Sequence, residues 1–203
     1  MIKIIGLTGP SGAGKTTLCS IADGFGIKSI DTDAVYHSLL VPPSACLDEL
    51  VSEFGKGILR SDGKLDRPAL ASIVFGENDA EKPKLKRLGE ITHKYVLNEA
   101  RRIIKAADAR GERAIIVDAP ALYESGFHKE CDFVICLLAS QGLRLRRIID
   151  RDHITEENAD RRIHGQKEDS FYMDRADYTL TNDGDVDGLR MSLQKILSDR
   201  GLI

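Results

Sequence analysis

Eight residues near the N-terminus constrain the fold of this 203-residue chain more than any other feature. An apolar run, residues 2–7, comes before them, and a helical pattern over residues 15–22 follows. They read Gly9-Pro10-Ser11-Gly12-Ala13-Gly14-Lys15-Thr16 and match the pattern G-x-x-x-x-G-K-[ST] at every defined position. A strand, a glycine-rich turn and a helix in this order predict an α/β fold with a phosphate-binding loop.

The residue types of this loop suit the binding of a nucleoside triphosphate. Glycines allow the backbone to curl so that successive N–H groups point into one concavity, and the following helix adds the positive end of its dipole. We expect Lys15 to reach the β- and γ-phosphates and the Thr16 hydroxyl to ligate Mg²⁺. The alternative is a glycine-rich turn that binds nothing. The loop leaves the reaction open, because GTPases, motor ATPases and small-molecule kinases share it.

Short apolar runs predict a parallel sheet. Most of them lack the alternation of polar and apolar residues, as expected for parallel strands that are covered on both faces. The runs are residues 2–7, 27–30, 114–117, 133–138 and 178–181. Helical patterns lie between them, which favours right-handed crossovers and a three-layer α/β sandwich with a five-stranded parallel sheet.

The interval between the second and third runs is longer than a simple crossover needs. We expect one helix capped by Ser44, a shorter one capped by Asp66, and a long helix over about residues 80–109, whose apolar positions recur at helical spacing. This block resembles a helical lobe that supplies a substrate surface. We therefore predict one domain, residues 1–203, in which a core of residues 1–33 and 114–203 carries an inserted substrate-binding lobe of about residues 34–113.

Carboxylates follow two of the predicted strands. Asp31 and Asp33 end the second strand, and in open α/β sheets such positions face the ligand crevice. Asp33 could hold or deprotonate an attacking hydroxyl, or it could cap the following helix. Asp31 could share that site or be the cap. Asp118 ends the third strand, where it could assist Mg²⁺ or begin a turn.

Arginines cluster after the fourth predicted strand. We expect Ser140 to cap a helix on which Arg147 and Arg151, four residues apart, share one face. Thr155 is expected to cap a second helix. Such a charged segment is either a solvated helix face or a mobile lid of about residues 141–170. Its place after a phosphate-binding loop favours a lid whose closure brings guanidinium groups onto the transferring phosphoryl group and excludes water.

Bulk composition argues against several other classes. The 29 basic and 32 acidic residues give a net charge of -3, whereas dedicated nucleic-acid-binding proteins are usually basic. The longest wholly apolar run, residues 133–139, is far shorter than the roughly 20 residues of a membrane helix, and residues 1–6 lack the pattern of a secretory signal. The cysteines form no Cys-x-x-Cys pair. We expect Cys19, Cys46, Cys131 and Cys136 to be reduced, mostly buried thiols of a cytoplasmic protein.

Charge is unevenly distributed along the chain. Residues 82–105 hold eight basic residues against two glutamates, and residues 144–151 hold four arginines against one aspartate. The near-neutral total is therefore an average over an acidic body and two basic segments. We expect these segments to steer small phosphorylated substrates.

Ordered motifs along nearly the whole chain resemble those of the dephospho-coenzyme A kinases, a branch of the nucleoside-monophosphate-kinase-like P-loop proteins. The phosphate-binding loop alone does not identify this family. The combination of the loop, the inserted lobe and the Asn-Asp-Gly segment near the end of the chain does. The matching segments are Gly6-Leu7-Thr8-Gly9, Ile30-Asp31-Thr32-Asp33, residues 54–55 and 62–67, Leu70, residues 73–75 and 118–126, Arg147, Arg151-Asp152, Arg162-Ile163, Gln166, Ala176-Asp177 and Asn182-Asp183-Gly184.

This resemblance implies transfer of the γ-phosphoryl group of ATP, with Mg²⁺, to the ribose 3′-hydroxyl of dephospho-coenzyme A. It implies that Asp33 is the base and that Lys15 and Arg147 stabilise the phosphoryl group. The implied ATP-binding residues are Gly12, Ala13, Gly14, Lys15, Thr16, Thr17 and Arg151. The implied substrate-binding residues are Asp33, Arg67, His93 and Glu124, and the implied metal-binding residues are Thr16 and Asp118. We expect no nucleic-acid or membrane partner and a monomer or weak homo-oligomer.

The chain departs from the family pattern at a few positions. His93 falls where the family has a His-Pro pair, but Lys94 follows it here, so a structural helix histidine is the alternative. Pro10 stands where the family commonly has Gly, and Ala121 and Tyr123 replace Leu and Phe. Two other functions stay open: another small-molecule kinase, acting on a nucleoside, nucleotide or sugar acid, and an ATP-binding regulator without turnover.

Overall fold

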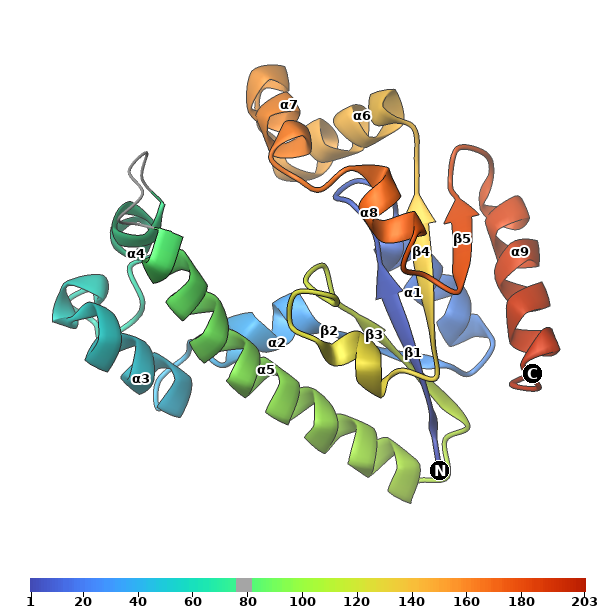
Figure 1. The fold of residues 1–203 in the computed structure, drawn as a ribbon, viewed down its shortest axis with the longest axis horizontal. Coiled ribbons are helices and arrows are strands. Elements are labelled where there is room, and N and C mark those ends of the chain that lie inside the picture. Colours follow the sequence, from blue (N-terminus) through green and yellow to red (C-terminus); the bar gives the residue numbers. More distant parts are fainter. Residues whose placement is uncertain (76–81) are drawn as a thin grey trace. The chain divides into compact units, whose positions relative to one another are not determined.

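Five parallel strands form one sheet in the order β2-β3-β1-β4-β5 in the computed structural model, which describes residues 1–75 and 82–203 (Figure 1). The strands are β1 (Lys3–Thr8), β2 (Lys28–Asp31), β3 (Ala114–Asp118), β4 (Phe133–Leu138) and β5 (Tyr178–Thr181). Each of the five apolar runs forms one of them, which confirms the predicted α/β class. The central strand β1 has neighbours that lie far away in sequence, Lys3 beside Ala114 and Thr8 beside Cys136.

Helices connect the strands as the periodicity predicts. They are α1 (Lys15–Gly24), α2 (Thr32–Ser38), α3 (Ala45–Phe54), α4 (Arg67–Val74), α5 (Lys82–Ala109), α6 (Gln141–Asp152), α7 (Glu156–His164), α8 (Asp169–Met173) and α9 (Val186–Asp199), with 3₁₀ turns at Lys56–Ile58 and Phe127–Glu130. Residues 80 and 81 of the predicted long helix lie outside the described residues.

Side-chain caps begin several of these helices, as predicted. Ser44 Oγ accepts the Leu47 N–H at 3.1 Å, Asp66 Oδ1 accepts the Ala69 N–H at 3.1 Å, and Thr155 Oγ1 accepts the Asn158 N–H at 3.4 Å. Ser140 is the N-cap residue of α6, as predicted, but its side chain makes no cap bond. Its backbone N–H instead donates to Asp183 Oδ1 at 2.6 Å.

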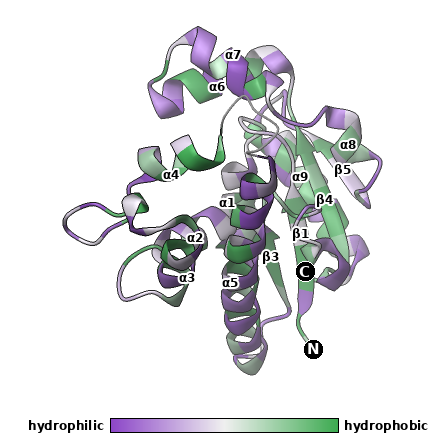
Figure 2. Cartoon of the chain, turned by 60° about the vertical axis from the view of Figure 1, so that its left-hand side comes forward, coloured by the Kyte–Doolittle hydropathy of each residue, from purple (hydrophilic) through white to green (hydrophobic). Residues whose placement is uncertain are grey.

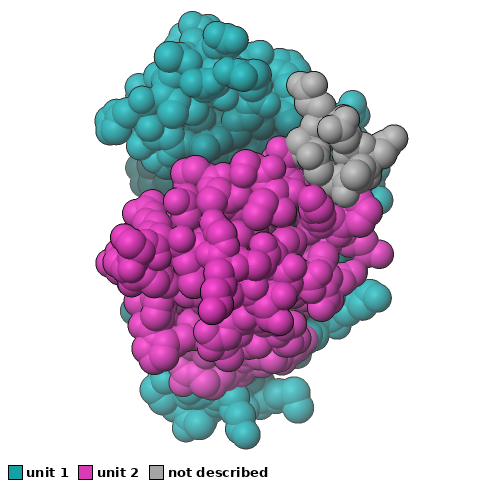
Figure 3. Space-filling view, turned by 90° about the vertical axis from the view of Figure 1, so that its left-hand side faces the viewer, with its two compact units in different colours: residues 1–30, 104–203 teal, residues 31–103 magenta. Residues whose placement is uncertain are grey.

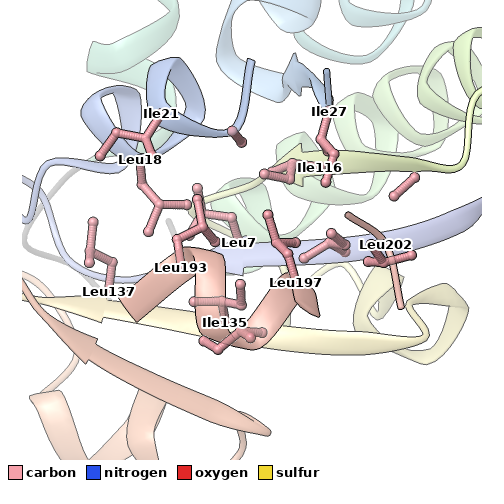
Figure 4. Packing of buried hydrophobic residues seen from close by; sticks show 14 of the residues in the cluster. Leu7, Leu18, Ile21, Ile27, Ile116, Ile135, Leu137, Leu193, Leu197 and Leu202 are labelled. Atoms are coloured by element: carbon pink, nitrogen blue, oxygen red, sulfur yellow. The ribbon is translucent and has the colours of Figure 1, made fainter. Parts of the chain in front are cut away.

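The main core lies between one face of the sheet and helices α1 and α9. Leu7 and Ile135 from the strands, Leu18 from α1, and Leu193 and Leu197 from α9 point toward one another there (Figure 4). Every residue of β4 is buried, and the strand is drawn as hydrophobic along its length in Figure 2. On the other face, Cys136 and Leu138 pack against Tyr172 of α8. Helical cover on both faces explains why the strands lack alternation.

The chain divides into two compact units, coloured separately in Figure 3. Unit 1 comprises residues 1–30 and 104–203 and holds the sheet core and the phosphate-binding loop. Unit 2 comprises residues 31–103 and has an apolar core of its own, in which Leu50 and Ile58 are fully buried and pack with Leu70 and Ile91. The predicted lobe of residues 34–113 overlaps unit 2, whereas the end of α5 belongs to unit 1.

The buried thiols lead to a prediction about their reactivity. No disulfide joins the four cysteines, which all lie among the described residues, and burial raises the pKa of Cys131 and of Cys136 to about 12. The thiolate is the reactive species. In the folded chain at about pH 8 we therefore expect iodoacetamide to alkylate both thiols at least about tenfold more slowly than in the denatured chain. Peptide mass spectrometry over time measures this, and equal rates in the two states would contradict it.

Candidate active site

The phosphate-binding loop joins the end of β1 at Thr8 to the start of α1 at Lys15. Gly14 stands at the N-cap of α1 with φ 98° and ψ 30°, and its carbonyl accepts the Leu18 N–H at 3.1 Å. A further bond, from the Ala13 N–H to the Pro10 carbonyl at 3.3 Å, closes the turn. The first N–H groups of a helix have no partner within the helix, so this end of α1 is suited to bind an anion.

Side chains of the first turn of α1 place a charge and two hydroxyl groups at this end. Lys15 Nζ donates to the Gly9 carbonyl at 2.9 Å and is thereby folded over the loop. Thr16 and Thr17 are exposed. The loop therefore combines backbone donors, an ammonium group and hydroxyl oxygens, which are the groups that bind a magnesium-loaded triphosphate in P-loop proteins.

Helix α6 contacts the loop with one arginine-bearing face. Arg147 Nη1 donates to the Gly12 carbonyl at 3.2 Å and to the Ala13 carbonyl at 3.4 Å, and its Nη2 donates to the Asn182 carbonyl at 3.0 Å. Arg151 Nη2 donates to Ser11 Oγ at 3.3 Å. The structure thus brings both predicted arginines to the loop, where Arg147 contacts carbonyl oxygens.

A third arginine of α6, to which the sequence analysis gave no role, lies beneath the loop. Arg144 is 5% exposed, and its Nε donates to the Ser11 carbonyl at 3.1 Å. Its Nη1 donates to Asp169 Oδ1 at 3.2 Å and its Nη2 to Gln166 Oε1 at 3.1 Å. Gln166 Oε1 also accepts the Ser11 N–H at 3.1 Å. The helical spacing of Arg144, Arg147 and Arg151 was the available signal, because residues three and four apart share a face.

The segment after β5 completes the contacts around the loop. Asn182 is 6% exposed, and its Nδ2 donates to the Ala13 carbonyl at 2.8 Å. The resemblance included this residue without giving it a role. Three consecutive loop carbonyls, those of Ser11, Gly12 and Ala13, are therefore held by side chains from other elements.

Asp152 orients the outer arginines of α6 and α7. Arg151 donates through Nε to Oδ1 at 2.7 Å and through Nη2 to Oδ2 at 2.9 Å, and Nη1 of Arg162 in α7 also donates to Oδ2. The hydrogen bond from Arg151 is the main cause that lowers the pKa of Asp152 to about 2. The carboxylate is therefore ionised at neutral pH, so it fixes the direction of the Arg151 guanidinium.

Asp118 is the second residue of unit 1, besides Thr16, that is predicted to bind the metal ion. It ends β3, half-buried, and stands in register with Leu7 of β1, one residue before Thr8. Glu124 is exposed in the turns that follow β3, close enough to Tyr172 to raise the pKa of that phenol together with its burial.

In unit 2 the structure separates the roles of the two aspartates after β2. Asp31 is the N-cap of α2, and its Oδ1 accepts the N–H groups of Asp33 at 2.9 Å and Ala34 at 3.0 Å. The alternative in which Asp33 is the cap is therefore wrong, because the helix begins at Thr32, two residues before the Ala34 start that an Asp33 cap requires. The Asp33 carboxylate lies exposed on the first turn of α2.

Asp33 shares its helix face with a basic pair. His37 is four residues further along α2, and its Nδ1 lies 2.6 Å from Arg67 Nη2 at the start of α4. Arginine is always a donor, so Nδ1 is the acceptor, and the ring proton is on Nε2. The pair thus presents donors only. His93 is half-buried in α5, one turn after Gly89. This position fits both a substrate-binding histidine and a structural one.

The basic residues of α5 are less available for attracting anionic substrates than the sequence indicates. Arg87 pairs with Glu53 at 3.0 Å and Lys94 with Glu49 at 2.5 Å, both acids lying on α3. A third pair joins Arg102 to Glu99 at 2.7 Å. Neighbouring acids thus offset part of the local excess, which weakens the expected steering by this segment.

Two features are absent from the part of the chain that the structure describes. No helix in residues 1–75 and 82–203 is long and apolar enough to cross a membrane. The same residues hold no cluster of three or more His, Cys, Asp or Glu side chains that could bind a metal ion by itself. P-loop enzymes need no such cluster, because phosphate oxygens supply part of the magnesium coordination.

Known proteins share this fold and these motifs. The sequence profile of the dephospho-CoA kinase family matches residues 3–188. A dephospho-CoA kinase from Corynebacterium diphtheriae is 38% identical over 188 residues, or 93% of this chain and 92% of the relative. A crystal structure from Thermus thermophilus has a TM-score of 0.78 at 27% identity and covers 98% of this chain and 97% of its own. A dephospho-CoA kinase from Campylobacter jejuni has a TM-score of 0.69 at 27% identity over 100% of both chains.

The similarity extends far beyond the phosphate-binding loop, which many unrelated enzymes share. It includes the lobe between β2 and β3 and the arginine-bearing segment after β4. As a kinase with a P-loop fold, the protein uses ATP. The chain belongs to the dephospho-CoA kinase family, and its reaction is the phosphorylation of dephospho-CoA, the last step of coenzyme A biosynthesis.

Proposed function

We propose that unit 1 binds ATP and that unit 2 binds dephospho-CoA. The observation that carries it is the separation of the groups: backbone donors and Lys15 gather at the loop of unit 1, whereas Asp33 and the His37–Arg67 pair share a helix face in unit 2. The attacking group is the ribose 3′-hydroxyl. Its oxygen forms a bond to the γ-phosphorus, the bond from that phosphorus to the β,γ-bridging oxygen breaks, and ADP leaves.

Asp33 is proposed as the base of this reaction. Its carboxylate has no capping role, because Asp31 caps α2, and its exposure leaves it accessible to a substrate hydroxyl. An accessible carboxylate can accept the hydroxyl proton as the new bond forms. Asp33 also orients the hydroxyl, which gives it a substrate-binding role.

The nucleotide is proposed to lie on residues 12–17. Backbone N–H groups and the ammonium of Lys15 counter the phosphate charge, and Arg151 reaches the same end of the loop through Ser11. Arg147 is proposed to stabilise the transferring phosphoryl group with its charge. In the structure its guanidinium donates to the carbonyls of Gly12, Ala13 and Asn182, which uses three of its five donors and holds the charge beside the loop.

The donor set also fits magnesium. The Thr16 hydroxyl and the Asp118 carboxylate offer oxygen atoms, which are the ligands that this small, hard cation prefers. Thr16 would bind the ion directly and Asp118 through water. When bound, the ion neutralises charge on the β- and γ-phosphates.

The compartment and the assembly state are proposed from less direct features. Four cysteines that form no disulfide among the described residues suit a reducing compartment, so we place the reaction in the cytoplasm. We propose a monomer or weak homo-oligomer whose partners are small molecules. Light scattering after size-exclusion chromatography measures the assembly state.

A coupled assay tests the proposed function as a whole. Purified protein with Mg-ATP is offered dephospho-CoA and, in parallel, a panel of nucleosides, nucleotides and sugar acids. We expect ADP release with dephospho-CoA, with product phosphorylated at the ribose 3′-oxygen by phosphorus NMR. Turnover of another panel member in preference to dephospho-CoA would overturn the substrate assignment.

Arg67 is expected to determine substrate affinity. The Arg67 guanidinium is oriented by His37, and His37 lies one helical turn from Asp33 on α2. Dephospho-CoA carries a diphosphate on the same ribose as the reacting hydroxyl. Replacing the charge in Arg67→Met should raise KM for dephospho-CoA about tenfold or more, because a charge-assisted hydrogen bond is lost. KM for ATP should stay within about twofold. Steady-state kinetics with each substrate varied measure both.

Two further variants make this test selective. Arg60→Met removes an exposed arginine of the same unit and should leave both KM values unchanged. His37→Leu removes the acceptor for Arg67 and should raise KM for dephospho-CoA by a smaller factor. An unchanged KM in Arg67→Met would exclude Arg67 from substrate binding.

A further inference from the structure

Side chains outside the phosphate-binding loop hold three consecutive carbonyl groups of the loop. Arg144 donates to Ser11 at 3.1 Å, Arg147 to Gly12 at 3.2 Å, and Asn182 to Ala13 at 2.8 Å. We call these three residues, Arg144, Arg147 and Asn182, the carbonyl clamp. They come from α6 and from the segment after β5, so elements distant in sequence meet on one side of the loop.

The geometry of the peptide bond converts this contact into control of the N–H groups. In a planar trans peptide the carbonyl of one residue and the N–H of the next point in opposite directions. Holding the Ser11 carbonyl therefore fixes the direction of the Gly12 N–H, and holding the Ala13 carbonyl fixes that of the Gly14 N–H. Both N–H groups then point away from the clamp. The Ala13 N–H, between them, donates to Pro10 at 3.3 Å.

The clamp approaches the loop too closely for side chains. A Cβ atom on Gly14 would lie 2.2 Å from Asn182 Nδ2, and one on Gly12 would lie 2.8 Å from the Arg144 carbonyl. Both glycines also have positive φ, 98° and 80°, which other residues rarely adopt. The loop glycines thus permit the approach of the clamp in addition to that of phosphate.

Two members of the clamp are buried, so their hydrogen bonds are made in the absence of competing water. Arg144 is 5% exposed and Asn182 6% exposed. Arg144 is fixed by further contacts, to Gln166 Oε1 and to Asp169 Oδ1, and Gln166 also accepts the Ser11 N–H. Both backbone groups of Ser11 are therefore engaged. Buried polar groups that are each held by several partners keep a binding site in its binding geometry before the ligand arrives.

We propose that Arg144 and Asn182 are positioning residues for ATP: they orient the Gly12 and Gly14 N–H groups toward the phosphates before the nucleotide binds. The proposal rests on the proposed placement of ATP at residues 12–17. It adds that nucleotide affinity depends on side chains that do not touch the nucleotide. Their loss lets the peptides rotate, so part of the binding free energy is spent on ordering the loop.

The test uses the full chain and calorimetric titration with Mg-ADP. In Asn182→Ala we expect Kd for ADP to rise at least about tenfold, and Arg144→Met to show a similar or larger rise. KM for ATP should rise in parallel, whereas KM for dephospho-CoA should stay within about twofold. Arg144→Lys keeps one donor and should recover part of the affinity. The matched control is Arg146→Met, which removes an exposed arginine of the same helix and should bind ADP as the unaltered chain does.

Thermal unfolding separates this role from a general loss of structure. If Arg144→Met fails to fold, Asn182→Ala and Arg144→Lys decide the question. A folded Asn182→Ala protein with unchanged Kd for ADP, or with KM for both substrates raised equally, would overturn the proposal. An error in the substrate assignment gives a different result: the unaltered chain would bind ADP but would not turn over dephospho-CoA.

Discussion

Asp33→Asn is expected to lower kcat by about 100-fold or more, because a positioned general base contributes roughly 10²–10⁴ to the rate. Asn has nearly the same shape and can still accept a hydrogen bond from the ribose hydroxyl, but it does not take up the proton. The Kd for ADP should be unchanged, since the phosphate-binding loop is in unit 1 and Asp33 is in unit 2. Rapid-quench kinetics and calorimetry measure these quantities.

Asp31→Asn is the matched control for this variant. It removes the same charge two residues earlier, and Asn caps helices about as well as Asp does. Its kcat should remain within a few-fold of that of the unaltered chain, because Asp31 accepts the N–H groups of Asp33 and Ala34 in the structure. Full turnover in Asp33→Asn would remove Asp33 from the role of base. A loss of equal size in both variants would assign the effect to the structure of α2.

Lys15→Met should lower kcat/KM for ATP by about 10²–10³, the usual effect of removing one preorganised donor from a site of developing charge. The ammonium lies at the loop, where Nζ donates to the Gly9 carbonyl at 2.9 Å, and phosphate oxygens are the stronger acceptors once the nucleotide is bound. The methionine fills the same volume without the charge. KM for dephospho-CoA should change little. Initial-rate kinetics with ATP varied give the result.

Two lysine variants complete this experiment. Lys195→Met removes an exposed lysine of α9 and should leave kcat/KM unchanged. Lys15→Arg keeps the charge but replaces a compact ammonium with a planar fork, so we expect most of the loss to remain. Activity of Lys15→Met equal to that of the unaltered chain would show that the loop backbone alone holds the phosphates.

The local elements of this fold could be predicted because their causes are local. A strand covered on both faces is a continuous apolar run, which is how β1, β3 and β4 were found. The caps Ser44 and Asp66 were identified for the same reason, because a cap bonds within three residues along the chain. Ser140 occupies the predicted N-cap position, but its backbone N–H is held by Asp183, 43 residues away, and no local pattern indicates that contact.

Function could be predicted in part, and for a related reason. The pattern of residues 9–16 identifies phosphate binding by itself, because all of its ligating groups lie in one short segment. The two roles available to Asp33 could not be separated from spacing, and only the position where α2 begins, with Asp31 as its cap, excludes the capping role. The catalytic role of Asp33 and the roles of Arg67, His93, Glu124 and Asp118 remain predictions.

By itself, the sequence determined the parallel sheet, the phosphate-binding loop and the resemblance to dephospho-CoA kinases, because each depends on the order and spacing of residues along the chain. Only the tertiary structure decided which side chains surround the loop. Arg144 and Asn182 reach carbonyls 133 and 169 residues away in sequence. Such contacts arise when β4 pairs with β1 and β5 with β4, and no periodicity along the chain encodes them.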